Sequence, residues 1–237
     1  SEMCIRDRSL DGSKLELKEH QKQALAALEE MRCNFETIAL LYHATGTGKT
    51  VTAVMDAKRF GKRTLFLAHT VELVDQATKT FRELWPRATV GRYVESMKQG
   101  NAFVVCGSIQ SVALNLERFK PDDFGYIIVD EAQFLTRDEV RYLTDLVDDW
   151  NIPVICYGLR TDFKGELFPG SAELLATADV IEEVKTICWC GKKALCNARF
   201  DESGHVIKEG EQVVLGANDK YIGLCRKHWK EGNLGPQ

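Results

Sequence analysis

A glycine-rich segment between an apolar strand and a helix constrains this chain more than any other feature. Residues 38–42 are apolar, residues 43–50 read His-Ala-Thr-Gly-Thr-Gly-Lys-Thr, and a helical pattern then runs to about Phe60. Backbone N–H groups of such a loop point at phosphate oxygens, and the helix N-terminus adds favourable partial charge. Lys49 is expected to reach the outer phosphates and Thr50 to bind magnesium. The expected nucleotide-binding residues of this loop are Thr45, Gly46, Thr47, Gly48, Lys49 and Thr50.

The remaining apolar runs predict a parallel sheet covered by helices on both faces. Continuous apolar runs of strand length, without alternation, are typical of strands buried on both sides. We predict strands at 64–68, 103–106, 126–129 and 153–158, and helices at 15–32, 71–84 and 137–150. Beyond residue 185 the sequence pattern changes to short polar segments of hairpin length with glycines and cysteines, which indicates a small separate module.

Composition limits the size and setting of the protein. The chain has 237 residues, which suffice for one large domain or one domain plus a small module. Its net charge of -4 excludes a global basic field for nucleic acid but not a local basic groove. No apolar run approaches the roughly 20 residues that a membrane helix needs, and no secretory signal is evident. Eight cysteines beside a phosphate loop favour a reduced, cytoplasmic setting with a metal site.

Four of the polar side chains near the C-terminus have the spacing of metal ligands. Cys188 and Cys190 form one pair, and Cys225 and His228 form a second pair across a loop. Three thiolates and one imidazole make a closed tetrahedral Zn²⁺ site. Structural zinc contributes about 10–16 kcal/mol of folding free energy, which a module with few core residues needs. The alternative is two buried thiols beside a surface histidine.

The N-terminal half resembles superfamily 2 helicases of the type III restriction-enzyme-like group. The loop has their Ala-x-Gly-x-Gly-Lys-Thr form, and residues 17–24 resemble their adenine-contacting segment, which implies Gln21 as a base-edge partner. Residues 68–77 and 107–111 resemble their segments that contact the nucleic-acid backbone. The resemblance covers about 15–132 and implies a RecA-like P-loop NTPase fold of class α/β, with nucleic acid as a partner under this interpretation alone.

A helicase also needs a second RecA-like domain, and we expect none in the residues that follow Gln133. That domain supplies an arginine finger, worth about 10³–10⁵ in rate. A first domain alone is therefore expected to bind ATP but to hydrolyse it poorly.

The C-terminal half resembles bacterial class II thymidine kinases. The resemblance rests on residues 130–136, 152–168, 174–176, 185–191, 210–221 and 225–228. It implies thymidine as substrate, ATP, Mg²⁺ and Zn²⁺ as cofactors, and a homotetramer. It also leaves Cys196 out of the metal site.

The kinase resemblance assigns roles to individual residues. Glu131 would be the general base, and Asp130 would hold magnesium through water. Gln133 would be one of the residues that bind the nucleotide. Phe134, Tyr221 and Gly216 would form the nucleoside site. In a helicase the same Glu131 would polarise a water molecule, so this residue does not discriminate between the two activities. For Phe134 and Tyr221 ordinary core packing is the alternative.

One element of the kinase family is missing. An Asp-x-Arg element that organises magnesium and phosphates is not found in residues 60–100. The nucleoside pocket would consequently lack its N-terminal wall.

We interpret the chain as a chimera fused at the strand ending in Asp130 and Glu131. Its expected parts are a tail at 1–8 that resembles a translated sequencing adapter, a helicase-like ATP-binding segment at 9–132, a thymidine kinase core at 127–185, and a zinc ribbon with a nucleoside-covering loop at 186–237. The expected function is ATP-dependent phosphorylation of thymidine. The alternatives are a truncated helicase ATPase domain and an inactive chimera that binds nucleotide.

Overall fold

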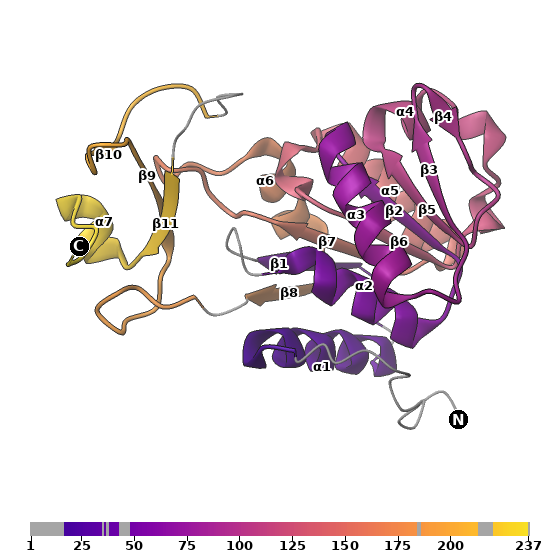
Figure 1. Cartoon of the computed structure of the whole chain (residues 1–237), viewed down its shortest axis with the longest axis horizontal. Coiled ribbons are helices and arrows are strands. Elements are labelled where there is room, and N and C mark those ends of the chain that lie inside the picture. The colour runs from indigo at the N-terminus through magenta and orange to yellow at the C-terminus, as the bar shows by residue number, and fades with distance from the viewer. Residues whose placement is uncertain are drawn as a thin grey trace.

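The larger part of the molecule is built around one twisted sheet. The computed structural model describes residues 17–34, 36, 38–42, 48–183, 186–212 and 220–236. Among these residues, eight strands form a sheet in the order β4-β3-β5-β2-β6-β7-β1-β8 (Figure 1). All neighbouring pairs are parallel except β3 with β4. The strands are β1 (Ile38–Tyr42), β2 (Thr64–Ala68), β3 (Val90–Val94), β4 (Met97–Lys98), β5 (Val104–Ser108), β6 (Tyr126–Val129), β7 (Val154–Gly158) and β8 (Val180–Glu183).

Helices cover both faces of this sheet, as the apolar runs predict. One core cluster joins α1 (Glu19–Cys33), α2 (Lys49–Phe60) and α3 (Val71–Leu84) to one face, with α2 and α3 in front of the sheet in Figure 1. The other cluster joins α4 (Ile109–Ala113), α5 (Arg137–Trp150) and α6 (Pro169–Thr177) to the opposite face. Successive residues of each strand alternate between the clusters. The expected α/β class with a mostly parallel sheet is confirmed.

Strands that sequence reasoning missed lie toward the edges of the sheet. The bounds predicted for β1, β2, α3, β6 and α5 agree with the structure. In β3 the apolar run is interrupted by Gly91 and Arg92, and β8 ends in Glu182 and Glu183. Strand β8 pairs on one side only, so its side chains need not be apolar. The helix expected over residues 15–32 is α1, and residues 15 and 16 lie outside the described part.

Strands from the two expected segments interleave in the sheet. Strand β7, from the second segment, lies between β6 and β1 of the first segment. Val154 of β7 is in register with Ile127 of β6 and with Ile38 of β1. The segments at 9–132 and 127–185 therefore build one sheet together.

A small antiparallel module follows the main sheet. Strands β9 (Cys196–Phe200), β10 (Val206–Ile207) and β11 (Lys220–Leu224) pair in the order β10-β9-β11, and α7 (Arg226–Glu231) ends the module (Figure 1). The indole of Trp229 donates a hydrogen bond to the carbonyl of Phe163 at 3.0 Å. The guanidinium of Arg199 lies 5.1 Å from the centroid of the Phe163 ring. These contacts join the module to the loop after β7.

Three short 3-10 helices complete the chain's regular structure in the described residues. They are η1 (Leu116–Arg118), η2 (Pro121–Asp123) and η3 (Ala132–Phe134). None of the described helices is both long and apolar enough to cross a membrane.

A buried ion pair fixes α1 to α2 beneath the sheet. The guanidinium of Arg32 binds both carboxylate oxygens of Asp56 at 2.5 and 3.1 Å, and the Tyr126 hydroxyl donates to the same carboxylate. The Asp56 side chain is fully buried. Burial by itself lowers the pKa of Arg32, but the adjacent carboxylate raises that pKa above its ordinary value. The Arg32 guanidinium therefore stays charged in this buried position.

Substituting Asp56→Ala is expected to destabilise the fold by about 3–5 kcal/mol, because it leaves the Arg32 charge buried and unpaired. Urea denaturation measures the change in the free energy of unfolding. The matched control is Lys79→Ala, which removes an exposed ion pair to Glu83 at 4.0 Å and should cost less than about 1 kcal/mol. Equal costs for the two variants would contradict the assignment.

Candidate functional site

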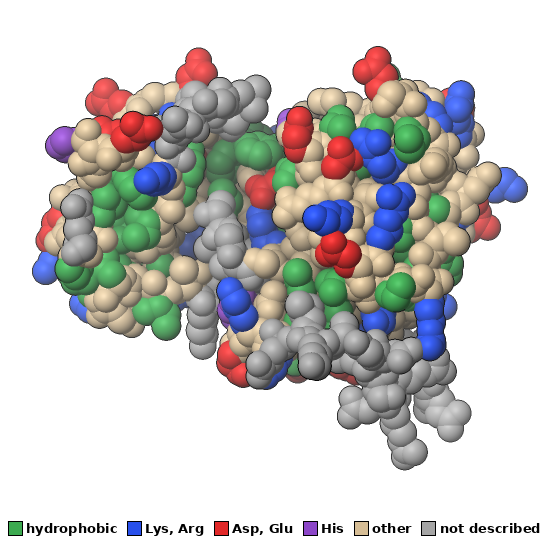
Figure 2. All heavy atoms as spheres, viewed as in Figure 1, with side chains coloured by type: hydrophobic (Ala, Val, Ile, Leu, Met, Phe, Trp, Pro, Cys, Tyr) green, Lys and Arg blue, Asp and Glu red, His purple; other side chains and the backbone are tan. Residues whose placement is uncertain are grey.

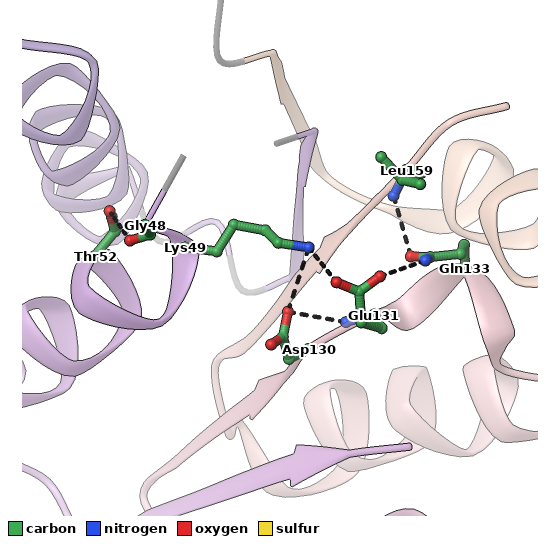
Figure 3. Close-up of polar contacts among 7 residues, drawn as sticks. All are labelled: Gly48, Lys49, Thr52, Asp130, Glu131, Gln133 and Leu159. Carbon is green, nitrogen blue, oxygen red and sulfur yellow. Dashed lines mark hydrogen bonds and ion pairs between the residues drawn. The ribbon is translucent and has the colours of Figure 1, made fainter. Parts of the chain in front are cut away.

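Charged side chains converge where the parallel strands end. Lys49 begins α2 directly after the glycine-rich loop, and its Nζ forms an ion pair with Glu131 Oε1 (Figure 3). The same Nζ lies 3.8 Å from Asp130 Oδ1. Asp130 and Glu131 follow β6, whose carboxyl end lies at the same sheet edge as that of β1. The carboxyl edge of an open parallel sheet is where ligands bind in such folds.

The Glu131 carboxylate is held at both oxygens. While Oε1 faces Lys49, Oε2 accepts a hydrogen bond of 2.5 Å from Gln133 Nε2. The Gln133 side chain is itself fixed, because its Oε1 accepts from the Leu159 N–H at 3.1 Å (Figure 3). The Glu131 backbone has φ +52°, in the left-handed region that is costly for a residue with a Cβ. This backbone strain at a charged residue is typical of functional sites.

Asp130 is a carboxyl group in a poor environment for charge. It is buried, and burial raises its pKa; Lys49 opposes this shift, and Glu131 adds to it. Its Oδ1 accepts a hydrogen bond from the Glu131 N–H at 3.0 Å. A carboxyl group with a raised pKa lowers stability as pH rises from its unfolded-state pKa toward its folded-state pKa. A cation bound beside Asp130 would offset the cost of its charge.

Helix α1 supports the end of the glycine-rich loop. Gln21 is buried, and its Nε2 donates to the Gly48 carbonyl at 3.2 Å while its Oε1 accepts from the Lys18 N–H at 2.9 Å. The structure thus places Gln21 against the loop, while a contact to a nucleotide base stays a prediction. Gly48 has φ +80°, and a Cβ at this position would lie 2.7 Å from Gln21 Nε2.

Substituting Gly48→Ala is expected to cost about 1–2 kcal/mol from the left-handed backbone and, in addition, to displace Gln21. Gly61→Ala is the matched control, because Gly61 has φ +67° and nothing within 4 Å of a Cβ. Thermal unfolding should show the larger loss for the variant at Gly48, and nucleotide affinity should fall in that variant alone. Equal effects in both variants would show that the contact with Gln21 contributes nothing.

Aromatic rings lie next to the charged cluster. The Phe134 ring is 5.4 Å from the His69 ring and 5.7 Å from the Phe168 ring. Tyr221 lies on β11 in the small module and is 45% exposed. The ring contacts of Phe134 in the described part of the chain are with His69 and Phe168 and do not include Tyr221. Thr50 is half-buried in the first turn of α2. Thr45, Gly46, Thr47 and Gly216 lie outside the described residues.

Sequence reasoning missed two neighbours of this site. Leu159 follows β7 and orients Gln133 through its backbone N–H. His69 follows β2 and contacts Phe134. The signal that could have found both is their position directly after an apolar strand, since parallel strands end at one edge.

The four expected metal ligands come together in the small module. The ligand atoms of Cys188, Cys190, Cys225 and His228 all lie within 4.8 Å of one another. Cys188 Sγ is 3.3 Å from His228 Nδ1, and Cys190 Sγ is 3.9 Å from Cys225 Sγ. Burial would raise the pKa of Cys188, but N–H groups of Cys190 and Cys225 and the His228 side chain lower it to about 6. Such a thiolate-stabilising donor set fits a closed Zn²⁺ site.

Comparison with known proteins agrees with these features. The thymidine kinase family model matches residues 36–229. A thymidine kinase of Jannaschia sp. (strain CCS1) is 43% identical over 175 residues, which are 72% of this chain and 90% of that protein. The thymidine kinase of Idiomarina loihiensis is 40% identical over 191 residues, which are 80% of this chain and 94% of that protein.

Other relatives match a shorter part of the chain. The thymidine kinase of Legionella pneumophila (strain Paris) is 55% identical over 112 residues, which are 47% of this chain and 54% of that protein, so the chain spans about half the length of this relative. Among solved structures, the UvsW helicase from bacteriophage T4 has a TM-score of 0.55 at 17% identity, over 71% of this chain and 60% of that chain. That likeness shows the fold alone.

The fold, the carboxylate cluster and the cysteine–histidine group all agree with the family match. The match extends over both halves of the sheet, from residue 36 to residue 229. Two of the relatives align over at least 90% of their own length. The chain belongs to the thymidine kinase family.

Proposed function

We propose that this chain transfers the γ-phosphate of ATP to the 5′-hydroxyl of thymidine, with Glu131 as the general base. The main support is the cluster of Lys49, Asp130 and Glu131 at the carboxyl ends of the strands. Phe134 follows this cluster, and the chain belongs to the thymidine kinase family. The cluster supplies a cation for phosphate, a carboxylate for a metal ion and a carboxylate for a proton.

The proposed reaction uses groups that already face one another. The thymidine 5′-oxygen attacks the γ-phosphorus and gives its proton to Glu131, while the bond to the β,γ-bridging oxygen breaks and ADP leaves. General base catalysis of this kind contributes about 10²–10⁴-fold. In the free protein Lys49 occupies Oε1 of this base. Binding of the phosphates would draw Lys49 away from Glu131, and Gln133 would keep the carboxylate in place.

The cofactor assignments follow from the same residues. Thr45, Gly46, Thr47, Gly48 and Lys49 would surround the phosphates, and Thr50 and Asp130 would hold Mg²⁺, with Asp130 acting through water. A Mg²⁺ ion held by these residues would neutralise the charge that develops on the phosphates. Zn²⁺ would be structural, held by Cys188, Cys190, Cys225 and His228, and Cys196 would take no part, since the metal-binding group found among the described residues does not include it.

The nucleoside-binding assignments stay proposals. Phe134 would flank the thymine base, and Tyr221 and Gly216 would belong to a loop that covers it. Phe134 is half-buried, so part of its ring remains available to a ligand. The homotetramer and the class II assignment rest on the resemblance of the C-terminal half.

We further propose that the chain joins two families at the strand ending in Asp130 and Glu131. The proposal rests on the two resemblances described above, since the N-terminal segment carries the helicase-like motifs and the C-terminal segment carries the kinase motifs. Amplification across the codons for residues 100–160 from unfragmented DNA tests the junction. One product of the expected length supports a real fusion, and two separate genes contradict it.

The activity test separates the candidate functions. The full chain is incubated with labelled ATP and Mg²⁺, first with thymidine and then with DNA or RNA in its place. Labelled thymidine monophosphate supports the proposed kinase. ATP hydrolysis stimulated by nucleic acid, with no nucleotide product, would favour the helicase alternative. ATP binding with neither activity would identify an inactive chimera.

A further inference from the structure

The pairing of β2 with β6 places His69 at the same end of the sheet as the proposed general base. Leu67 of β2 is in register with Val129 of β6, and the Asp130 N–H donates to the Leu67 carbonyl at 2.8 Å. His69 follows Leu67 by two positions, and Glu131 follows Val129 by two positions. The histidine therefore follows its strand at the edge where the charged cluster lies.

The ring of His69 faces aromatic side chains. Its centroid is 5.4 Å from that of Phe134, with the two planes inclined by 42°. Phe168 also contacts Phe134, edge to face with ring centroids 5.7 Å apart, and is buried. His69 and Phe134 are both half-buried, so each residue keeps an exposed part. The three rings form an aromatic group in which Phe168 is buried and His69 and Phe134 are partly exposed.

We propose that His69 is a substrate-contact residue that supplies a ring wall for the nucleoside site. The inference rests on the proposed function, and it answers the missing N-terminal wall, because His69 comes from the segment before Asp130. The ligand class is a pyrimidine nucleoside, whose flat base would pack against the exposed parts of His69 and Phe134 while its 5′-oxygen reaches Glu131. Aromatic contacts of this kind contribute about 0.5–1.5 kcal/mol beyond area burial, which is about 2- to 12-fold in affinity.

Direct binding tests the proposal without relying on turnover. The dissociation constants of thymidine and of ATP are measured by calorimetry on the full zinc-loaded chain and on its variants. His69→Ala is expected to weaken thymidine binding about 5- to 10-fold and to leave ATP binding within about twofold. His69→Phe keeps a ring and should bind thymidine like the unaltered chain. His205→Ala is the matched control, because the His205 side chain is 82% exposed in the small module.

The possible results separate this inference from the proposed function. Unchanged thymidine affinity in His69→Ala, or equally weak binding in His69→Phe, overturns the ring wall. Failure of the unaltered chain to bind thymidine overturns it as well. Thymidine binding that depends on a ring at position 69, without phosphorylation by the unaltered chain, upholds the inference and overturns the kinase activity. Circular dichroism and thermal unfolding show that each variant is folded.

Discussion

Replacing Glu131 with Gln is expected to lower the rate of thymidine phosphorylation by about 10²–10⁴-fold, because the amide cannot accept the 5′-hydroxyl proton. Size and hydrogen bonding to Gln133 are nearly preserved, so thymidine affinity should change little. The measurement is kcat with saturating ATP and thymidine, together with the dissociation constant of thymidine. A large fall in kcat with unchanged binding identifies a group that acts on the reacting atoms.

The control for this substitution is Glu117→Gln, which changes an exposed carboxylate paired only at 4.0 Å with Arg118. Its kcat should match that of the unaltered chain. If Glu131→Gln kept more than a tenth of the activity, Glu131 would not be the base. Weakened thymidine binding at unchanged kcat would instead assign it to substrate positioning.

Loss of zinc is expected to unfold the small module while the main sheet stays folded. The module's core consists of Cys188, Ala198, Leu224 and Cys225, of which two are metal ligands. So small a core cannot offset chain entropy without about 10–16 kcal/mol from a bound metal. Cys225→Ser should contain less than one zinc per chain and lose the near-ultraviolet signal of Trp189, which stacks on His228 at 4.2 Å.

The matched control for Cys225→Ser is Cys196→Ser, which alters a half-buried thiol on β9 outside the ligand group. It should retain one zinc and the same thermal transition. Equal zinc loss in both variants would contradict the four-ligand assignment. A folded module without zinc would show that the metal is dispensable for its structure.

The central elements of the sheet were predictable, because each carries its own signal. Strand β6 reads Tyr-Ile-Ile-Val, and helix α5 begins at a Thr136–Glu139 capping box, so their bounds follow from local sequence. Strand β8 was not predictable in this way, since its glutamates lie at an edge that pairs on one side. The order of the strands also lies beyond local patterns, because it depends on contacts between distant segments.

The candidate site was predictable where chemistry and spacing coincide. The four expected metal ligands come together as the spacing of Cys188–Cys190 and Cys225–His228 indicates. The ion pair between Lys49 and Glu131 follows from a loop and a strand end that share an edge. His69 was not predicted as a neighbour of Phe134, because its position after an apolar strand shows which end of the sheet it occupies but not which strands lie side by side.

The position of β1 determines when the nucleotide site can form during synthesis. Both hydrogen-bonding neighbours of β1 come late in the chain, from residues 154–158 and 180–183. On the ribosome, the strand that leads into the phosphate loop stays unpaired until those residues emerge. Contacts between such distant segments must overcome loop-closure entropy first and form slowly. A nascent or truncated chain ending near residue 132 would therefore leave β1 unpaired and expose it to aggregation.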